Sequence, residues 1–308
     1  MTFEMFVNKI VRAVADELSS EYEVTSREVP KNNGVVLTGL MIGKKGSCIT
    51  PVIYLNSMYE SYRTDDGHRD LDEMAKLIVA DYRKNQPEAE LAYNNLGGSL
   101  GYEKIRDKII FKLINTEKNR ELLKQIPNCP FHDLSVVFLL FLEEREEGIR
   151  TALIHNEHMD FWNVAIDELY DDAEKNTPRL LPETFTGINE VIQDLLGIDG
   201  CDDMSVKEIE EYPSPFYILT NRMGIEGAAC LLYPGVVRKY SEMLNCDLLI
   251  LPSSIHETLL LPYDNTINVD EIREMVQHIN ISEVAEEDRL SGQVYMYKRL
   301  EDMIFVAA

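Results

Sequence analysis

Two apolar stretches flank a run of charged residues in the middle of the chain. Residues 134–143 and 149–154 are rich in β-branched, aromatic and aliphatic side chains, and the segment EREEG separates them. This pattern predicts a β-hairpin with a charged turn. Strands joined by a hairpin run antiparallel, so the feature favours antiparallel pairing over a parallel sheet.

Helical and strand patterns alternate along the rest of the chain. Apolar side chains at helical spacing predict an amphipathic helix over residues 2–19. Further helices are expected at 69–84, 164–175, 224–244 (interrupted or restarted at Pro234) and 269–279, the first two ending at Pro87 and at the NTP segment 176–178. Strands are expected at 23–29, 35–42 and 49–55 as a meander, at 216–220, 248–251 and 258–261, and in the carboxy-terminal VYMYKR and MIFVA.

Residues 101–125 are ambiguous. The segment DKIIFKLIN fits a strand or the middle of a long helix, and we favour the strand. Hairpins outnumber strand, helix, strand units, so we predict an α+β fold. Its sheets are antiparallel or mixed, with packed helices and mostly hairpin connections.

Charge is distributed unevenly along the chain. The 308 residues carry a formal net charge of −24. Residues 1–125 hold 18 Lys and Arg against 19 Asp and Glu, whereas residues 126–308 hold 12 against 35. We therefore predict a near-neutral lobe, 1–125, and an acidic lobe, 126–308, with a single compact unit as the alternative. The acidic part repels phosphate backbones, which disfavours direct nucleic-acid binding and favours a basic protein partner.

Targeting signals and cofactor motifs are lacking. The amino terminus has no signal-peptide pattern, and the longest apolar run, 134–142, is about half of a membrane-spanning helix. The five cysteines are widely spaced and include no CxxC pair, which fits a reducing cytoplasm. We expect no cofactor and no membrane, and the sequence does not predict an oligomeric state.

The segment MIGKKGSCI, residues 41–49, is similar to the loop by which KH domains hold RNA. A KH domain needs a helix on each side of its GxxG loop. Here β-branched residues flank the loop and Pro51 follows closely, so we predict a hairpin turn with solvated lysines.

Metal binding has one candidate group. His155, His158 and Asp160 supply two imidazoles and a carboxylate within a short segment, which a divalent cation could use if all three faced one pocket. The competing interpretation is a loop from a strand to a helix. The pair His256 and Glu257 begins like HExxH, but the second histidine is missing, which excludes zincin chemistry.

Catalysis also has one candidate group. Ser253, Ser254, His256 and Glu257 lie between two predicted strands and supply a hydroxyl, an imidazole and a carboxylate. A triad is defined by geometry, and the GxSxG motif is absent. The competing interpretation is a turn whose hydroxyls satisfy backbone groups.

An anion could bind where a strand leads into a helix at NRMGIEG. The candidate residues are Asn221, Arg222, Gly224 and Gly227. The segment matches neither GxGxxG nor GxxxxGK[ST], and the glycines have a second explanation, which is close packing of the helix start on the sheet.

Several stretches together resemble a domain family of unknown function found in Clostridia-type Gram-positive gut bacteria. They are KNNGVVLTGLMI (31–42), ITPVIYLNSMYE (49–60), ALIHNEHMDFW (152–162), ELYDDAEKNTPRLLP (168–182), LTNRMGIEGAACLLYPGV (219–236) and LLILPSSIHETLLLP (248–262). The resemblance implies a cytoplasmic protein often encoded near mobile elements. It implies no activity and no catalytic residues.

Three functions remain open from the sequence. The leading hypothesis is a non-enzymatic interaction or regulatory protein whose acidic part engages a basic partner, with an anti-defence factor that mimics nucleic-acid charge as one variant. The alternative is a hydrolase or transferase built around residues 253–257. A third possibility is a housekeeping scaffold or oligomeric subunit.

Overall fold

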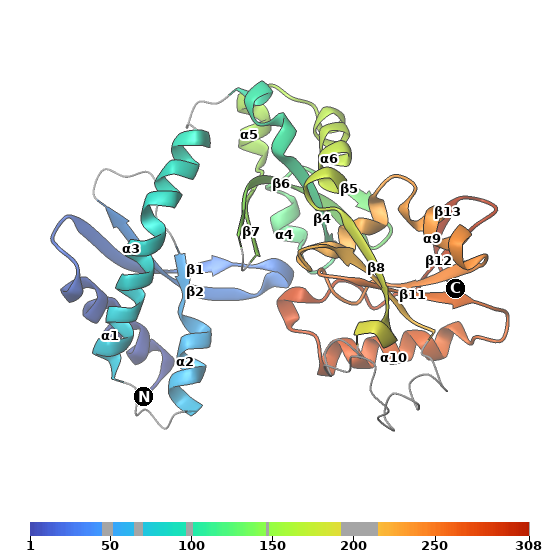
Figure 1. The fold of residues 1–308 in the computed structure, drawn as a ribbon. Coiled ribbons are helices and arrows are strands. Elements are labelled where there is room, and N and C mark those ends of the chain that lie inside the picture. Colours follow the sequence, from blue (N-terminus) through green and yellow to red (C-terminus); the bar gives the residue numbers. More distant parts are fainter. Residues whose placement is uncertain (45–51, 65–69, 97–100, 146–147, 192–214, 308) are drawn as a thin grey trace. The chain divides into compact units, whose positions relative to one another are not determined.

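The computed structural model describes residues 1–44, 52–64, 70–96, 101–145, 148–191 and 215–307. Internal packing divides the chain into two units, Met1–Leu100 and Gly101–Ala308 (Figure 1). Each unit has its own hydrophobic core. The architecture is α+β, with antiparallel sheets and packed helices, as the sequence predicts.

In the residues that the structure describes, the first unit combines one sheet with three α-helices. Its elements are α1 (Phe3–Glu17), β1 (Tyr22–Pro30), η1 (Asn32–Gly34), β2 (Val36–Lys44), β3 (Val52–Tyr54), α2 (Leu55–Thr64) and α3 (Leu71–Leu96). The three strands pair antiparallel in the order β1-β2-β3, so the meander is confirmed. Residues 45–47 of the predicted lysine-containing turn lie outside the described residues.

Helix α1 buries one face against α3. The Thr2 hydroxyl accepts a hydrogen bond from the Met5 amide and caps the helix start. Phe6, Ile10 and Val14 follow at helical spacing and are fully buried. They share a core with the buried face of α3, which includes Ala75 and Tyr82.

Two prolines do not end helices as predicted. Helix α3 continues past Pro87 to Leu96, and α6 (Ile166–Leu180) contains Pro178. A proline removes one backbone donor and costs about 3 kcal/mol within a helix, but it does not forbid continuation. In α6, tertiary contacts hold the last turns, because the Thr177 hydroxyl is buried and accepts a hydrogen bond from the Phe111 amide.

The second unit is larger, and its described residues form two sheets. Its elements are η2 (Tyr102–Lys104), η3 (Arg106–Lys108), β4 (Ile109–Asn115), α4 (Arg120–Leu123), β5 (Asn128–Phe131), β6 (Leu134–Arg145), β7 (Gly148–Leu153), α5 (Asn156–Trp162), α6 (Ile166–Leu180), β8 (Glu183–Gly187), β9 (Tyr217–Asn221), η4 (Gly227–Leu232), α9 (Val236–Leu244), β10 (Asp247–Leu251), β11 (Thr258–Tyr263), α10 (Val269–Ser282), η5 (Glu286–Asp288), β12 (Tyr295–Lys298) and β13 (Met303–Val306).

Strand β6 is the centre of a four-stranded sheet. It pairs antiparallel with β4, β5 and β7, and the β6–β7 hairpin is the one that the sequence predicts. Residues 101–125 contain the strand β4, in agreement with the favoured interpretation. The pairing of β4 with β6 crosses the boundary at 125/126, whereas the packing divides the chain at 100/101.

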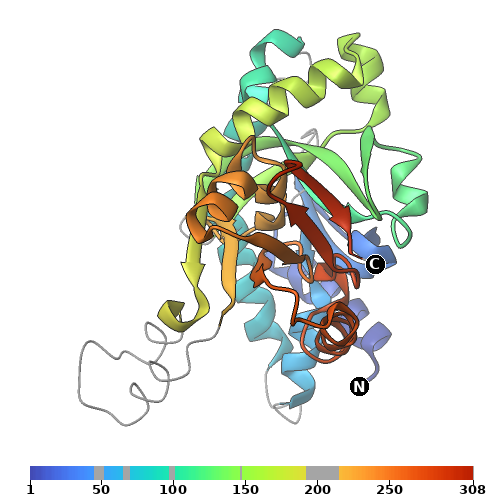
Figure 2. The ribbon, with the colours of Figure 1, turned by 90° about the vertical axis from the view of Figure 1, so that its right-hand side faces the viewer.

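A six-stranded antiparallel sheet has the order β13-β12-β10-β11-β9-β8. Successive residues of β10 point to opposite faces of the sheet and pack in two different cores. Leu248 and Ile250 belong to the main hydrophobic cluster, which includes residues of β4, β6 and α6. Leu249 and Leu251 belong to a smaller cluster, which includes residues of α10. Figure 2 shows α10 end-on, below the strands that it covers. A strand buried on both faces explains the continuous apolar run LLIL.

In the described residues, none of the helices combines the length and apolarity needed to cross a membrane.

Candidate functional site

The two candidate loops of the second unit meet in space. The Thr220 hydroxyl donates to the carbonyl oxygen of His256 at 2.7 Å, and the Ala228 amide donates to the carbonyl of Ile255 at 3.1 Å. A Cβ atom at Gly227 would lie 2.3 Å from the His256 carbonyl oxygen. Close approach of the two loops therefore requires a glycine at position 227. This agrees with the second explanation for the glycines, which is close packing and not anion binding.

Other groups engage both nitrogens of the His256 ring. Nδ1 accepts a hydrogen bond from the Glu226 amide at 3.4 Å, and Nε2 lies 3.3 Å from Oδ1 of Asp288. This arrangement assigns the ring proton to Nε2. No ring nitrogen is left to activate a serine.

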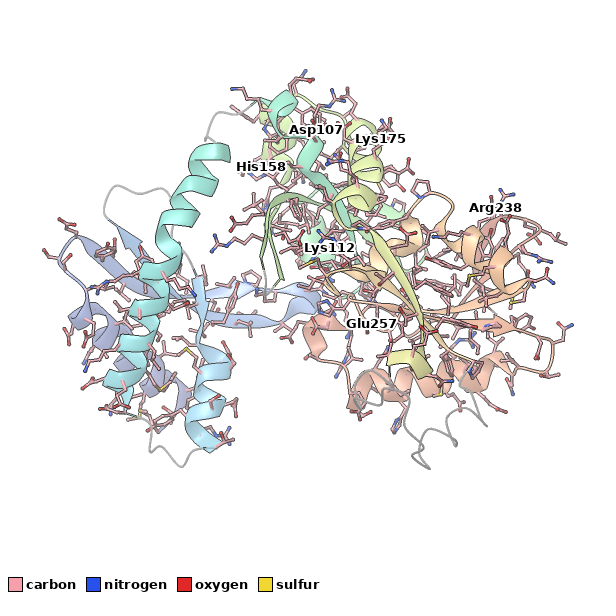
Figure 3. All side chains as sticks on the ribbon, in the orientation of Figure 1. Asp107, Lys112, His158, Lys175, Arg238 and Glu257 are labelled. Atoms are coloured by element: carbon pink, nitrogen blue, oxygen red, sulfur yellow. The ribbon has the colours of Figure 1, made fainter. Side chains whose placement is uncertain are left out.

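The serine hydroxyls and Glu257 do not complete a triad in this arrangement. The Ser254 hydroxyl accepts a hydrogen bond from the His256 backbone amide at 3.0 Å, which is a local turn contact. Ser253 is half-buried, and its carbonyl accepts from the Leu290 amide at 2.9 Å. The carboxylate of Glu257, labelled in Figure 3, makes no hydrogen bond with the described residues.

The candidate anion-binding residues shape their own loop. The Asn221 side chain is buried, donates to the Ile225 carbonyl at 2.7 Å and accepts from the Met223 amide at 2.9 Å. Arg222 pairs with Glu144 of β6. Gly224 adopts a left-handed conformation, with φ of 63°. The side chains of Asn221 and Arg222, which could have bound an anion, are therefore engaged within the protein.

An ion pair that the sequence did not indicate supports this loop. Nζ of Lys112, labelled in Figure 3, lies 2.7 Å from Oε1 of Glu226. Glu226 has φ of 55°, which is uncommon for a residue other than glycine, asparagine or aspartate. Its second oxygen, Oε2, is buried without a hydrogen-bond partner in the described part of the chain.

Two of the candidate metal residues, His155 and His158, form the cap of α5, while Asp160 is exposed within that helix. His155 precedes α5, and its backbone amide donates to Nδ1 of His158 at 2.9 Å. Burial, and next the nearby His155, lower the pKa of His158 below its usual value. Within the described ranges no three His, Cys, Asp or Glu side chains are grouped as metal ligands would be.

An open cleft of about 510 Å³ lies beside this cap. Its walls come from η2, η3, the end of α5 and the exposed face of α6. Its lining residues are Gly101, Tyr102, Glu103, Arg106, Trp162, Asn163, Val164, Glu168, Asp171, Asp172 and Lys175. Figure 3 labels Lys175 on α6 and His158 on α5.

A hydrogen-bonded centre fixes the floor of the cleft. The carboxylate of Asp172 accepts from the Tyr102 hydroxyl at 2.8 Å and from the Arg106 guanidinium at 3.1 Å. Burial, and next the hydrogen bond to Asp172, raise the pKa of Tyr102 well above its usual value. Tyr102 is therefore a neutral donor at physiological pH, and both oxygens of Asp172 are occupied.

Aromatic rings form one wall. The ring centroids of Tyr102 and Trp162 lie 6.0 Å apart, and His158 stacks on Trp162 at 5.5 Å with an interplanar angle of 24°. The chain contains a single tryptophan. The sequence analysis does not identify this wall, because Tyr102 and Trp162 are 60 positions apart and only the fold brings their rings together.

Together these features define an α+β protein whose second unit has an aromatic and acidic cleft. The sequence model of a family of unknown function (DUF5688) matches residues 3–299, so the chain belongs to that family. This finding confirms the family resemblance at the level of unknown function. Comparisons with curated proteins and with solved structures gave no match.

Proposed function

We propose that this protein is a non-enzymatic interaction protein of the cytoplasm, which binds a basic protein through the acidic surface of its second unit. The supporting observation is a set of carboxylates on α5 and α6 that lack cationic partners. Residues 155–175 contain seven acidic residues and one lysine. The exposed members are Glu157, Asp160, Asp167, Glu168 and Asp171.

Their environment favours an external cation. Among the described side chains, none of these five carboxylates forms an ion pair with Lys or Arg. Unpaired carboxylates of one sign on neighbouring helices create a negative potential that attracts a basic surface and raises the rate of association. Such attraction weakens with ionic strength.

Charge-neutralised variants test this proposal. Glu157→Gln, Asp160→Asn and Asp167→Asn together remove three carboxylates outside the cleft. The matched control, Glu274→Gln, Glu283→Gln and Glu301→Gln, removes three exposed carboxylates elsewhere in the second unit. Binding of a labelled oligolysine peptide is measured by fluorescence anisotropy at about 50 and 500 mM salt.

We expect the first variant to weaken binding about tenfold at low salt, and the control to weaken it much less. Proteins captured from a host lysate should be basic and should dissociate at high salt. Equal effects of the two variants, or binding indifferent to salt, would refute the proposal.

A more specific form of this proposal is that the protein is a decoy that mimics the charge of a nucleic acid. It would then occupy the binding site of a DNA-binding or RNA-binding protein, as an anti-defence factor does. The same exposed carboxylates support it. A captured partner should then release its nucleic acid when this protein is added, and the triple variant should release less. Simultaneous binding of protein and nucleic acid by the partner would exclude the decoy.

A hydrolase or transferase at Ser253, Ser254, His256 and Glu257 is the second candidate, favoured by the convergence of the two loops. It predicts covalent labelling of a serine by a fluorophosphonate probe and loss of labelling in Ser254→Ala or Ser253→Ala. The engaged His256 ring leads us to expect no labelling.

A further inference from the structure

We infer that the cleft of the second unit binds the cationic head group of a lysine or arginine side chain. This inference rests on the proposed function, because the side chain is supplied by the basic partner. It adds the place where one cation of that partner is held. The cleft is separate from the 253–257 loop, and the histidine cap borders it through His158, which stacks on Trp162.

Size and shape fit this ligand. The volume of about 510 Å³ falls within the range of about 300–1,000 Å³ that small-ligand sites occupy. The Tyr102 and Trp162 rings are inclined to each other by 47°. Aromatic faces attract ammonium and guanidinium groups within about 6 Å through the ring quadrupole.

The charges of the lining favour a cation over an anion. Four carboxylates, Glu103, Glu168, Asp171 and Asp172, outnumber two cations. Arg106 is already paired with Asp172 and Glu103, with N to O distances of 3.1 and 3.3 Å. An anion would find only Lys175 free of an ion pair among the described residues, whereas a cation would find both Glu168 and Asp171.

The hydrogen-bonded floor makes the site rigid before a ligand arrives. The Asp172 carboxylate accepts hydrogen bonds from both Tyr102 and Arg106, and the side-chain amide of Asn176 donates to the Arg106 backbone carbonyl at 2.7 Å. Wall and floor are thus connected by contacts between η2, η3 and α6. A preorganised site loses less conformational entropy on binding than a flexible one.

The experiment uses the only tryptophan of the chain as a reporter. Trp162 lines the cleft, so a bound cation should change its fluorescence. The 308-residue chain is titrated with the labelled oligolysine peptide, with an oligoarginine peptide and with an oligoglutamine control. Anisotropy of the label reports binding anywhere on the protein, and Trp162 emission reports occupancy of the cleft.

Three single variants give the sign of the ligand charge. Asp171→Asn removes a cleft carboxylate that has no ion pair, and Asp167→Asn makes the same change on the same helix outside the cleft lining. Lys175→Gln removes the free cation. For a cationic ligand we expect Asp171→Asn to weaken the Trp162-detected binding about threefold and Lys175→Gln to strengthen it by a similar factor. Asp167→Asn should change it less than twofold.

The outcomes separate the two proposals. Peptide binding without a change in Trp162 emission would overturn the cleft assignment and leave the proposed function standing. Absence of salt-sensitive peptide binding would overturn both. If Asp171→Asn strengthened the Trp162-detected binding and Lys175→Gln weakened it, the cleft would hold an anion, which also overturns the inference.

Discussion

The ammonium group of Lys112 lies 2.7 Å from a carboxylate oxygen of Glu226, and this ion pair joins β4 to the loop in front of η4. The two side chains are only 17% and 16% exposed. In a partly buried ion pair, each charge compensates for the water that the other has lost, because either charge alone would be poorly solvated. The pair therefore couples the four-stranded sheet to the loop that contacts His256.

Removing only one partner should destabilise the second unit. We expect Lys112→Met to lower the free energy of unfolding by about 2 kcal/mol, because Glu226 would remain partly buried and unpaired. Adding Glu226→Gln should recover part of that loss. Urea denaturation followed by Trp162 fluorescence measures both variants. A double variant less stable than Lys112→Met would contradict this explanation.

Gly227 should be the glycine most sensitive to substitution. A Cβ atom there would lie 2.1 Å from Oγ1 of Thr220 and 2.9 Å from the Asn221 nitrogen. We expect Gly227→Ala to lower the free energy of unfolding by about 3 kcal/mol through overpacking. The control is Gly101→Ala, since a Cβ atom there meets no heavy atom within 4 Å, and it should change stability by less than about 0.5 kcal/mol. Similar effects of the two substitutions would argue against the close loop contact.

The cap of α5 should be sensitive to acid. Burial and the neighbouring His155 lower the pKa of His158 in the folded protein, so the unfolded chain binds a proton first as pH falls. Stability should therefore decrease as pH falls below about 6.5, and the decrease should end once the folded state is also protonated.

The ring stacked on Trp162 provides the measurement. Protonation of His158 should quench Trp162 emission, with a midpoint below about 6.5. His158→Asn should abolish this transition, while His155→Asn should leave it in place with a higher midpoint, because one of the two causes of the low pKa is removed. A wild-type midpoint above 6.5 would contradict the assignment.

Asp247 should stabilise the six-stranded sheet at neutral pH. Burial alone would raise the pKa of Asp247, but hydrogen bonds from the Arg299 amide at 2.9 Å and the Lys298 ammonium at 3.1 Å outweigh it, and the pKa is lowered. A carboxyl group with a lowered folded pKa contributes stability above its unfolded value of about 4, and that contribution disappears as pH falls through the folded pKa.

Asp247→Asn should therefore be less stable than the wild type at pH 7, and the difference should shrink in acid. Urea denaturation at several pH values tests this, with Asp167→Asn as the comparison, since Asp167 is exposed and forms no ion pair with the described residues. A difference that is constant across the whole pH range would exclude the proposed cause.

Local patterns predicted much of the fold. The hairpin of β6 and β7, the amphipathic α1 and the apolar β10 follow from periodicity and turn residues within a few positions. The predicted helix ends at Pro87 and at Pro178 are wrong. A proline adds a local cost in free energy to a helix, and other contacts can offset that cost. The sequence favours a loop where the short helix α5 lies, because the usual signal for a helix start, a Ser, Thr, Asp or Asn cap, is replaced by histidines.

The cleft could not be predicted from neighbouring residues. Tyr102 and Asp172 are 70 positions apart, and their contact depends on how α6 packs on β4. The meeting of the 221–227 and 252–257 loops likewise depends on the strand order, in which β11 and not β10 lies beside β9. Sequence spacing carries no direct information on such long-range order.

The six-stranded sheet consists of three antiparallel pairs placed side by side, β8 with β9, β10 with β11, and β12 with β13. During synthesis each pair can form as soon as its second strand leaves the ribosome, and then dock on the edge of the pair before it. Until β12 arrives, β10 presents an unpaired apolar edge of the kind that recruits other chains. Premature termination before Tyr295 would therefore yield an aggregation-prone fragment and not a smaller version of the same protein.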